Sequence, residues 1–207
     1  MVLIKSMRSF PHSKRWHTRL AKDLSREAAD RLILRAEVHY HNLMAGNSLI
    51  QSITPNMDKE LHDLIYPVLA MYRAMLEEDP NQGLALEKLE ILMKEDFFRG
   101  LGKGIGFLDF LPDPFQVIRP VLRRMTQSQY PPGFQVVVED DRNCFAINAI
   151  RCFKLEVLTD LNAGELTGLY CKTDDWLSAK LPKIHWSRTK TLAQEHDMCD
   201  FRWSRVA

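Results

Sequence analysis

The period of the hydrophobic pattern changes near residue 130, and this change constrains the fold more than any other feature of the sequence. Before it, apolar residues recur every three or four positions, which is typical of amphipathic helices. After the turn 130–133, residues 134–139 and 144–151 are rich in β-branched and aromatic residues and flank the polar turn 140–143, which indicates a β-hairpin. The order of segments predicts an α+β fold, with N-terminal helices packed on a C-terminal antiparallel sheet that has intervening helices.

Helical segments account for most of the first part of the chain. Ser25 is a suitable N-cap and Gly46 a suitable stop for the first of them. Proline removes a helical hydrogen bond, so Pro67 predicts that the second helix is kinked or split. The expected helices cover residues 25–45, 57–78, 84–98 and 115–125.

Two features interrupt the helical pattern further along. The run 100–106 contains four glycines but follows a helix and lacks the GK[ST] ending of a phosphate loop, so we expect a flexible connector. Pro120 is expected to interrupt the last of the helices. Beyond the hairpin, the pattern predicts helices over residues 153–161 and 165–181 and strands over residues 183–193 and 198–205.

The length of the chain favours one domain. A chain of 207 residues is within the range of a single globular domain. We therefore expect one α+β domain over residues 1–207, composed of an extended N-terminal arm (1–24), a helical half (25–126) and a sheet-containing half (130–205).

The charge balance excludes several kinds of partner. Lys and Arg total 28 against 27 for Asp and Glu, and the sequence contains no long basic block, so nucleic acid is not expected to bind. The first fifteen residues contain four basic residues and lack the apolar stretch of a signal peptide or membrane anchor. We expect a cytoplasmic protein that binds a small molecule and no membrane, and a homodimer is compatible with these features.

The residues best suited to chemistry gather in the last third of the chain. Cys171 and Asp174 form a C-x-x-D element, Arg188 begins an R-x-x-T-L-A element, and residues 199–202 read Cys-Asp-Phe-Arg. In this order and spacing they resemble the L-2-amino-thiazoline-4-carboxylic acid hydrolase-like family, in which a cysteine also stands at the position of Cys152. The resemblance is best over the sheet-containing half of the chain.

One segment departs from the pattern of the family. Residues 194–197 read Gln-Glu-His-Asp where family members carry small, glycine-type residues. Glycine would permit a tight turn with positive φ, so Glu and His here predict a different loop with two added titratable groups. This departure leaves the substrate open.

The resemblance implies a hydrolase that acts on a carbon–nitrogen bond of a small cyclic substrate of the amidine or thiazoline type. Such a ring opening needs a nucleophile and a proton donor for the leaving atom. Cys171 and Asp174 are three residues apart and face the same side of a helix, which favours Cys171 as the nucleophile, so that Cys171→Ser would abolish turnover. Asp174 would orient a proton donor or the substrate; a solvated or capping carboxylate is the alternative.

Arg188 suits a substrate carboxylate, because its planar guanidinium donates two parallel hydrogen bonds; an ion pair with Asp200 or Glu156 is an equal alternative. Alternation along the last strand places Cys199 on one face with Phe201 and Trp203, as part of the core or of a site wall. The candidate catalytic residues are Cys171, Asp174, His196 and Cys199, and the candidate substrate-binding residues are Arg188, Thr191, Cys152 and His39.

The two candidate histidines each have a second interpretation. His196 suits a general base if its loop folds over the thiols, although a histidine in such a loop is commonly exposed. His39 lies on the apolar face of its helix, as a core residue or a site residue. A zinc or iron site that includes His196 and Cys199 is an alternative, but no tight ligand spacing supports it, so no cofactor is expected.

Three classes of function remain: a hydrolase, a related isomerase or cyclase, and a non-catalytic domain that binds a small ligand. All four cysteines are expected to be free thiols. For an enzyme, we expect Cys152, Cys171 and Cys199 to approach one another around a common pocket, and activity to depend on Cys171 and Asp174.

Overall fold

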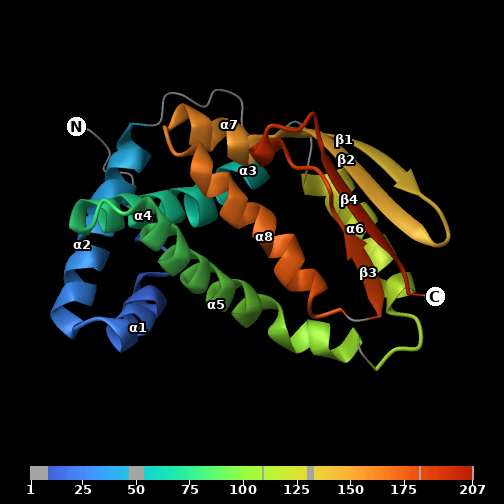
Figure 1. Cartoon of the computed structure of the whole chain (residues 1–207), viewed down its shortest axis with the longest axis horizontal. Coiled ribbons are helices and arrows are strands. Elements are labelled where there is room, and N and C mark those ends of the chain that lie inside the picture. The colour runs from blue at the N-terminus through green and yellow to red at the C-terminus, as the bar shows by residue number, and fades with distance from the viewer. Residues whose placement is uncertain (1–8, 47–53, 109, 130–132, 182, 207) are drawn as a thin grey trace. The chain divides into compact units, whose positions relative to one another are not determined.

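The chain was analysed as a computed structural model that describes residues 9–46, 54–108, 110–129, 133–181 and 183–206. The contacts divide the chain into two compact units, Met1–Met93 and Lys94–Ala207, and each is described by itself. Figure 1 traces both along the chain. The organisation as one domain stays a prediction, and most of the turn expected at 130–133 lies outside the described residues.

Helix α1 (Ser13–Asp23) lies within the segment expected to be an extended arm over residues 1–24, so that expectation is wrong for residues 13–23, and residues 1–8 lie outside the described residues. Trp16 and Leu20 lie one helical turn apart on α1, and both side chains are buried. This short apolar face is what stabilises the helix.

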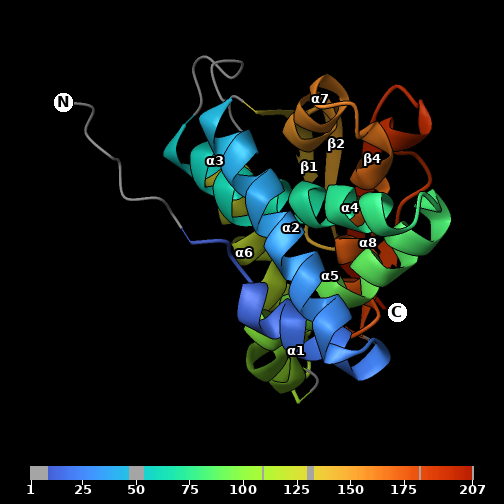
Figure 2. The same cartoon turned by 90° about the vertical axis from the view of Figure 1, so that its left-hand side faces the viewer.

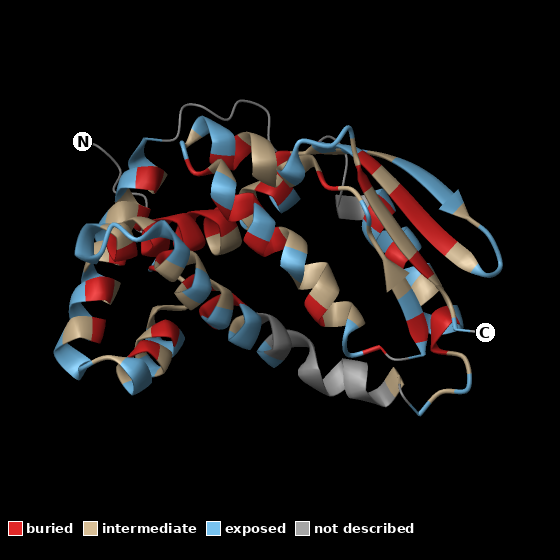
Figure 3. Ribbon diagram, in the orientation of Figure 1, coloured by how far each residue is buried: buried red, intermediate tan, exposed pale blue. Residues whose placement is uncertain are grey.

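Helix α2 (Arg26–Ala45) has the predicted limits. The Ser25 hydroxyl accepts a hydrogen bond from the Ala28 N–H at the N-terminus, and Gly46 caps the C-terminus. The buried face of α2 packs against α4 (Tyr66–Glu78), and Figure 3 shows buried residues along both helices.

The second predicted helix contains a π-helical turn before Pro67 but is not split in two, because the backbone stays helical from Pro55 to Glu78. A π-helical turn, Leu61–Ile65, separates α3 (Pro55–Glu60) from α4. Pro67 lies in the first turn of α4, where its missing N–H is least costly.

Helix α5 (Gln82–Leu108) is longer than predicted, and the connector expected at residues 100–106 is wrong because the backbone there stays helical. Glycine lowers helix propensity by about 1 kcal/mol without forbidding a helix. Helix α6 (Pro114–Gln129) likewise continues through Pro120 instead of being interrupted there. Among the described residues, no helix combines the length and apolar character needed to cross a bilayer.

The second unit contains an antiparallel sheet in the order β1-β2-β4-β3 (Figure 1), which confirms the α+β class. The expected strand over 183–193 is too long, because the chain leaves the sheet after Ser187 and forms a 3₁₀ turn at Leu192–Gln194. The strands are β1 (Phe134–Asp140), β2 (Cys144–Cys152), β3 (Ile184–Ser187) and β4 (Cys199–Arg205).

Two helices follow the hairpin, as predicted. Helix α7 (Phe153–Asp160) continues directly from β2, and a 3₁₀ turn at Gly164–Leu166 leads into α8 (Thr167–Ser178). Helix α8 contacts α7, β3 and the Leu192–Gln194 turn, and Figure 2 gives a second view of this region.

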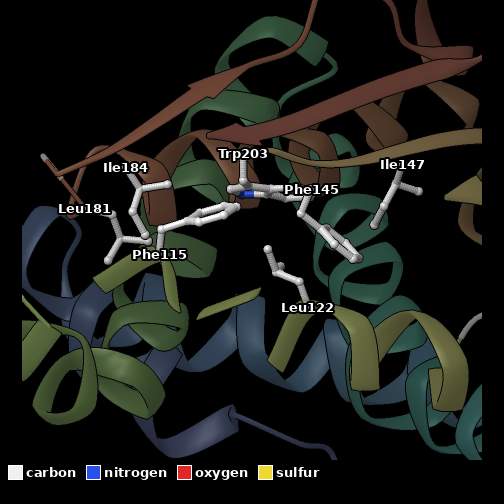
Figure 4. Close-up of a cluster of buried hydrophobic side chains, with 7 residues drawn as sticks. All are labelled: Phe115, Leu122, Phe145, Ile147, Leu181, Ile184 and Trp203. Atoms are coloured by element: carbon white, nitrogen blue, oxygen red, sulfur yellow. The ribbon is translucent and has the colours of Figure 1, made fainter. Parts of the chain in front are cut away.

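A cluster of buried apolar side chains joins α6 to one face of the sheet. Phe115 and Leu122 of α6 meet Phe145 and Ile147 of β2 and Trp203 of β4 (Figure 4). Burial of each such side chain contributes roughly 1.5–3 kcal/mol. Helix α6 therefore covers one face of the sheet, as expected of the helical half; for the helices of the first unit this arrangement stays a prediction.

Candidate functional site

Three cysteines from different elements gather around the middle of α8. Cys171 is on α8, Cys152 ends β2, and Cys199 begins β4. Antiparallel pairing of β2 with β4 brings Cys152 and Cys199 to the same end of the sheet. Both thiols contribute to raising the pKa of Cys171, so the three lie within electrostatic range of one another. Cys144 begins β2 at its other end, and all four cysteines are free.

The environment of Cys171 favours the neutral thiol. Burial is the largest cause that raises the pKa of Cys171 to about 12, and nearby Cys199, Cys152 and Asp174 raise it further, against a lowering effect of Arg188. At pH 7 a thiol with this pKa is ionised in on the order of one molecule in 10⁵. At neutral pH this site therefore does not by itself supply the thiolate that a cysteine nucleophile requires.

Asp174 differs from an ordinary surface carboxylate. Burial raises its pKa to about 6, with a further contribution from Asp175, although Lys154 and Arg188 act in the opposite direction. Its side chain nevertheless keeps 35% of its exposure. A carboxyl group that is accessible, poorly hydrated and able to change protonation near neutral pH has the properties of a general acid or base.

Arg188 is a largely buried cation that ties α8 to the chain after β3. Its Nη1 donates to the Cys171 carbonyl oxygen at 2.8 Å, and its Nη2 donates to Asp175 Oδ2 at 2.8 Å, with Asp174 Oδ2 3.9 Å from Nη1. Its guanidinium also lies about 6 Å from the ring centres of Trp186 and Phe201. Arg188 thus holds the backbone of the C-x-x-D element in place and pairs with Asp174 and with Asp175, which follows the element.

The ion-pair partners proposed for Arg188 from the sequence are wrong. Asp200 instead accepts hydrogen bonds from the backbone N–H groups of Thr189 and Lys190 and from the Thr189 hydroxyl. Glu156 pairs with Arg151. The aspartate of the Cys-Asp-Phe-Arg element is therefore a structural residue that holds the segment after β3 against β4.

The other members of the Cys-Asp-Phe-Arg element also have structural roles. Phe201 stacks against Trp186 and Trp203, with ring centres 5.8 and 6.0 Å apart. Arg202 donates to the Asn148 side chain on β2 at 2.7 Å. Cys199 is buried on the face that it shares with Phe201 and Trp203, as strand alternation predicted.

The turn before β4 holds Thr191 through Gln194 and brings the backbone of Leu192 to the Cys199 sulfur. The Thr191 hydroxyl donates to the Gln194 side chain at 3.1 Å, and the Leu192 N–H donates to the Cys199 sulfur at 3.2 Å. Burial raises the pKa of Cys199, while this N–H lowers it. Thr191 is itself buried, so its hydroxyl is committed to the turn.

The loop that departs from the family pattern contains a positive φ after all. Glu195 adopts the left-handed conformation (φ 64°, ψ 19°) that a glycine would favour. His196 is exposed in this turn and influences Asp197 electrostatically. Glu195 therefore takes the conformation that glycine would permit, and a loop different from that of family members stays a prediction.

Replacing Glu195 by glycine should stabilise the protein. A left-handed conformation costs a residue with a Cβ about 1–2 kcal/mol, and part of the gain is offset by the greater freedom of glycine in the unfolded chain. We expect the free energy of unfolding to rise by roughly 0.5–1 kcal/mol in urea titrations. Glu195→Ala keeps the Cβ and serves as the control; an equal gain from alanine would contradict this explanation.

His39 belongs to the first unit. Its Nε2 lies 2.9 Å from Glu77 Oε1, which links α2 to α4. This pairing explains why a histidine stands beside the apolar face of α2, whereas its predicted role in substrate binding stays a prediction.

Sequence reasoning missed three residues of the site: Asp175, Trp186 and Lys154. Asp175 points about 100° away from Asp174 on the helix, yet it accepts hydrogen bonds from Arg188 and from Trp186 Nε1, the latter at 3.1 Å. Lys154, at the start of α7, is close enough to lower the pKa of Asp174. The sequence carries no signal for these long-range pairs.

The described residues contain no group of three or more His, Cys, Asp or Glu side chains arranged to hold a metal ion. The three cysteines come from separate elements, and Cys199 is engaged by a backbone N–H. A zinc or iron site therefore gains no support from the geometry.

The fold and the site together define an α+β protein in which a desolvated aspartate stands beside three thiols and a buried arginine. Residues 19–203 match the protein family described as L-2-amino-thiazoline-4-carboxylic acid hydrolase. The chain belongs to this family, and the match extends through the helical part that the motifs did not cover. No curated protein matches the sequence.

Two solved structures resemble the chain at a low level. They are crystal structures of the Fe(II) unliganded H-NOX protein from K. algicida and of a mutant of it, which are 11% and 10% identical to this chain. Each comparison covers 94% of this chain and 95% of the other, with TM-scores of 0.42 and 0.41. Similarity at this level carries no conclusion about function.

Proposed function

We propose that this protein hydrolyses a carbon–nitrogen bond of a small cyclic substrate of the amidine or thiazoline type, with Asp174 and Cys171 at the centre of the site. The observation that carries the proposal is the Asp174 carboxyl, accessible yet desolvated, with a pKa raised to about 6 beside the thiol cluster. Membership of the hydrolase family supports this class of reaction.

Asp174 is the proposed proton-transfer group. In its ionised form it takes a proton from a water molecule as the water oxygen attacks the ring carbon between the heteroatoms. This proton passes to the ring nitrogen as the carbon–nitrogen double bond becomes single. The second proton of the water follows through Asp174 as the carbon–oxygen double bond forms and the carbon–nitrogen bond breaks, so the nitrogen leaves as an amine and Asp174 returns to its ionised state. A carboxyl that titrates near neutral pH is suited to both transfers.

Cys171 takes part as a neutral thiol in this proposal. Its raised pKa opposes the thiolate, whereas a thiol beside the reacting ring can donate a weak hydrogen bond and exclude water. Cys152 and Cys199 are proposed to line the same side of the site as Cys171. Thr191 is proposed to stabilise the turn that holds Cys199. His196 lies in the exposed turn and is a second proposed source of a proton.

Arg188 has capacity for a substrate carboxylate in addition to its structural role. A guanidinium has five N–H donors, and hydrogen bonds to Cys171 and Asp175 occupy two of them. The remaining donors suit a carboxylate on the substrate. The free thiols agree with a proposed location in the reducing cytoplasm.

Cys171→Ser tests the role of the thiol. Because water is the proposed nucleophile, we expect the variant to retain turnover within roughly tenfold of the native protein. The assay follows ring opening of L-2-amino-thiazoline-4-carboxylic acid by NMR, with circular dichroism to confirm folding. A loss of about 10⁴-fold or more in a folded variant would instead identify Cys171 as a covalent nucleophile.

The same carboxyl supports a second candidate function. An acid–base group with a pKa of about 6 also serves an isomerase or cyclase that moves a proton within a ring. NMR distinguishes the two reactions, because hydrolysis incorporates oxygen from ¹⁸O-labelled water into the product and isomerisation does not. A ligand-binding domain without activity would show neither reaction.

A further inference from the structure

The second unit contains a cavity of about 260 Å³ at a distance from the cysteine cluster. It lies where α6, the turn between β1 and β2, and the end of β4 meet. Strand β4 runs from Cys199, in the cluster, to Arg205, at the cavity, which separates the two places by roughly 20 Å at the usual rise per residue. The cavity therefore does not belong to the site described above.

The cavity is lined mainly by arginines. They come from three elements: two from α6, one from the β1–β2 turn and one from the end of β4, with Phe115 and Pro120 as an apolar part of the wall. The four are Arg119, Arg123, Arg142 and Arg205. Like charges at this density repel one another, so such an arrangement needs negative charge to balance it.

Part of that balance comes from Asp140, which holds the two arginines of α6. Arg119 Nε donates to Asp140 Oδ1 at 2.5 Å, and Arg123 Nε donates to Oδ2 at 2.7 Å. Through these bonds a single carboxylate fixes two guanidinium groups side by side. Each arginine keeps N–H groups that these bonds do not use.

Arg142 stands in a rigid turn. The Asp141 carboxylate accepts hydrogen bonds from the backbone N–H groups of Asn143 and Cys144, at 2.6 and 2.8 Å. The Arg205 N–H donates to the Asn143 carbonyl at 3.2 Å, which ties the turn to the end of β4. Arg142 is thus presented at the cavity on a fixed backbone, and its exposed side chain has no ion pair within the described residues.

Arg205 lines the cavity at the end of β4 and is held by an ion pair. Its Nη2 pairs with Asp113 Oδ2 at 2.5 Å, whereas its Nε is buried and has no hydrogen-bond partner. Because this Nε has no accessible surface, a ligand can meet only the exposed part of the guanidinium; the Arg205 side chain is 28% exposed. Counting Asp113, Asp140 and Asp141 against the four arginines leaves this cluster with a net charge of 4 − 3 = +1.

The geometry points to a binding site for a phosphate group carried by a small molecule. Several guanidinium groups from different elements converge on one polar cavity, and arginine binds phosphate oxygens through paired, charge-assisted hydrogen bonds. The volume exceeds that of phosphate alone, and Pro120 lines the rest of the cavity beside Gln116, while Phe115 belongs to the buried core behind it. Nothing in this inference depends on the proposed hydrolase activity.

Calorimetry with phenyl phosphate tests the inference, because this probe combines a phosphate with an apolar ring. At constant ionic strength we expect a dissociation constant of about 1 mM or lower, with weaker binding of inorganic phosphate and of benzoate. Arg142→Gln should weaken binding roughly tenfold and leave thermal stability unchanged, because Arg142 is exposed. Arg124→Gln, an exposed arginine of α6 that does not line the cavity, should bind phenyl phosphate like the native protein.

An NMR measurement places the ligand. Addition of phenyl phosphate should shift the Arg205 Nε–H resonance, because the charge and the aromatic ring of the ligand lie beside this guanidinium. Absence of binding up to about 10 mM, equal weakening by Arg124→Gln, or an unmoved Arg205 resonance would overturn the assignment of the cavity. Benzoate binding as tightly as phenyl phosphate would overturn the assignment to phosphate.

Discussion

Asp174→Asn is expected to remove nearly all activity and at the same time to stabilise the protein above pH 6. Asparagine has nearly the same shape as aspartate but cannot exchange a proton at neutral pH. Loss of a general acid or base typically lowers kcat by about 10²–10⁴-fold, and we expect a decrease in this range for ring opening of L-2-amino-thiazoline-4-carboxylic acid. In the native protein, the rate should rise with pH through about 6, as Asp174 ionises.

The expected gain in stability follows from the sign of the pKa shift. Burial raises the pKa of Asp174 from 3.8 to about 6, so the folded protein binds this proton more tightly than the unfolded chain does. The stabilisation is therefore complete below about pH 4 and is lost as the pH rises through 6. Above pH 6 the folded protein holds an ionised carboxylate in a poorly hydrated place, and asparagine removes that cost.

The size of this gain is modest, because the side chain is 35% exposed and solvent screens its charge. After that discount, we expect roughly 1–2 kcal/mol at pH 8, about 2–6 °C in Tm, and no difference at pH 4. Asp160→Asn, at an exposed position ending α7, is the matched control and should change neither quantity. If Asp174→Asn kept the native rate of ring opening, Asp174 would have no part in the mechanism, whatever the stability of the variant.

Arg188→Met should be the most destabilising of the substitutions considered. Methionine fills part of the volume of arginine but leaves the Asp175 carboxylate and the Cys171 carbonyl without their donor. Breaking a buried ion pair costs about 3–5 kcal/mol, and the partial exposure of Asp175 reduces this to roughly 2–3 kcal/mol in urea unfolding. Because Arg188 lowers the pKa of Asp174, the midpoint of any pH–rate profile should also move upward.

The control for Arg188 is Arg151→Met. Arg151 pairs with Glu156 at 2.6 Å, but both side chains are more than 40% exposed, so its removal should cost less than about 0.5 kcal/mol. Equal losses in the two variants would show that burial of Arg188 has no special importance. An unchanged pH midpoint in a folded Arg188→Met protein would contradict its electrostatic influence on Asp174.

Local patterns in the sequence were sufficient for many elements of the fold. The N-cap at Ser25, the irregular helical turn near Pro67 and the hairpin of β1 and β2 depend on neighbouring residues, so the sequence shows them directly. The glycines of α5 misled the prediction because propensity is a weak preference that the rest of the helix can override. The strand expected over 183–193 failed because Asp200, eleven residues away from Thr189, binds the backbone there.

The sequence by itself determined the α+β class, the family, and the order of Cys171, Asp174, Arg188 and Cys199 along the chain. Only the tertiary structure decided which charged side chains form ion pairs. Arg188 pairs with Asp175 instead of Asp200, and the pKa of Asp174 is raised while that of Asp200 is lowered by its hydrogen bonds with Thr189 and Lys190, although burial alone would raise it. Pairing and hydration depend on distances between elements remote in sequence, which no local pattern encodes.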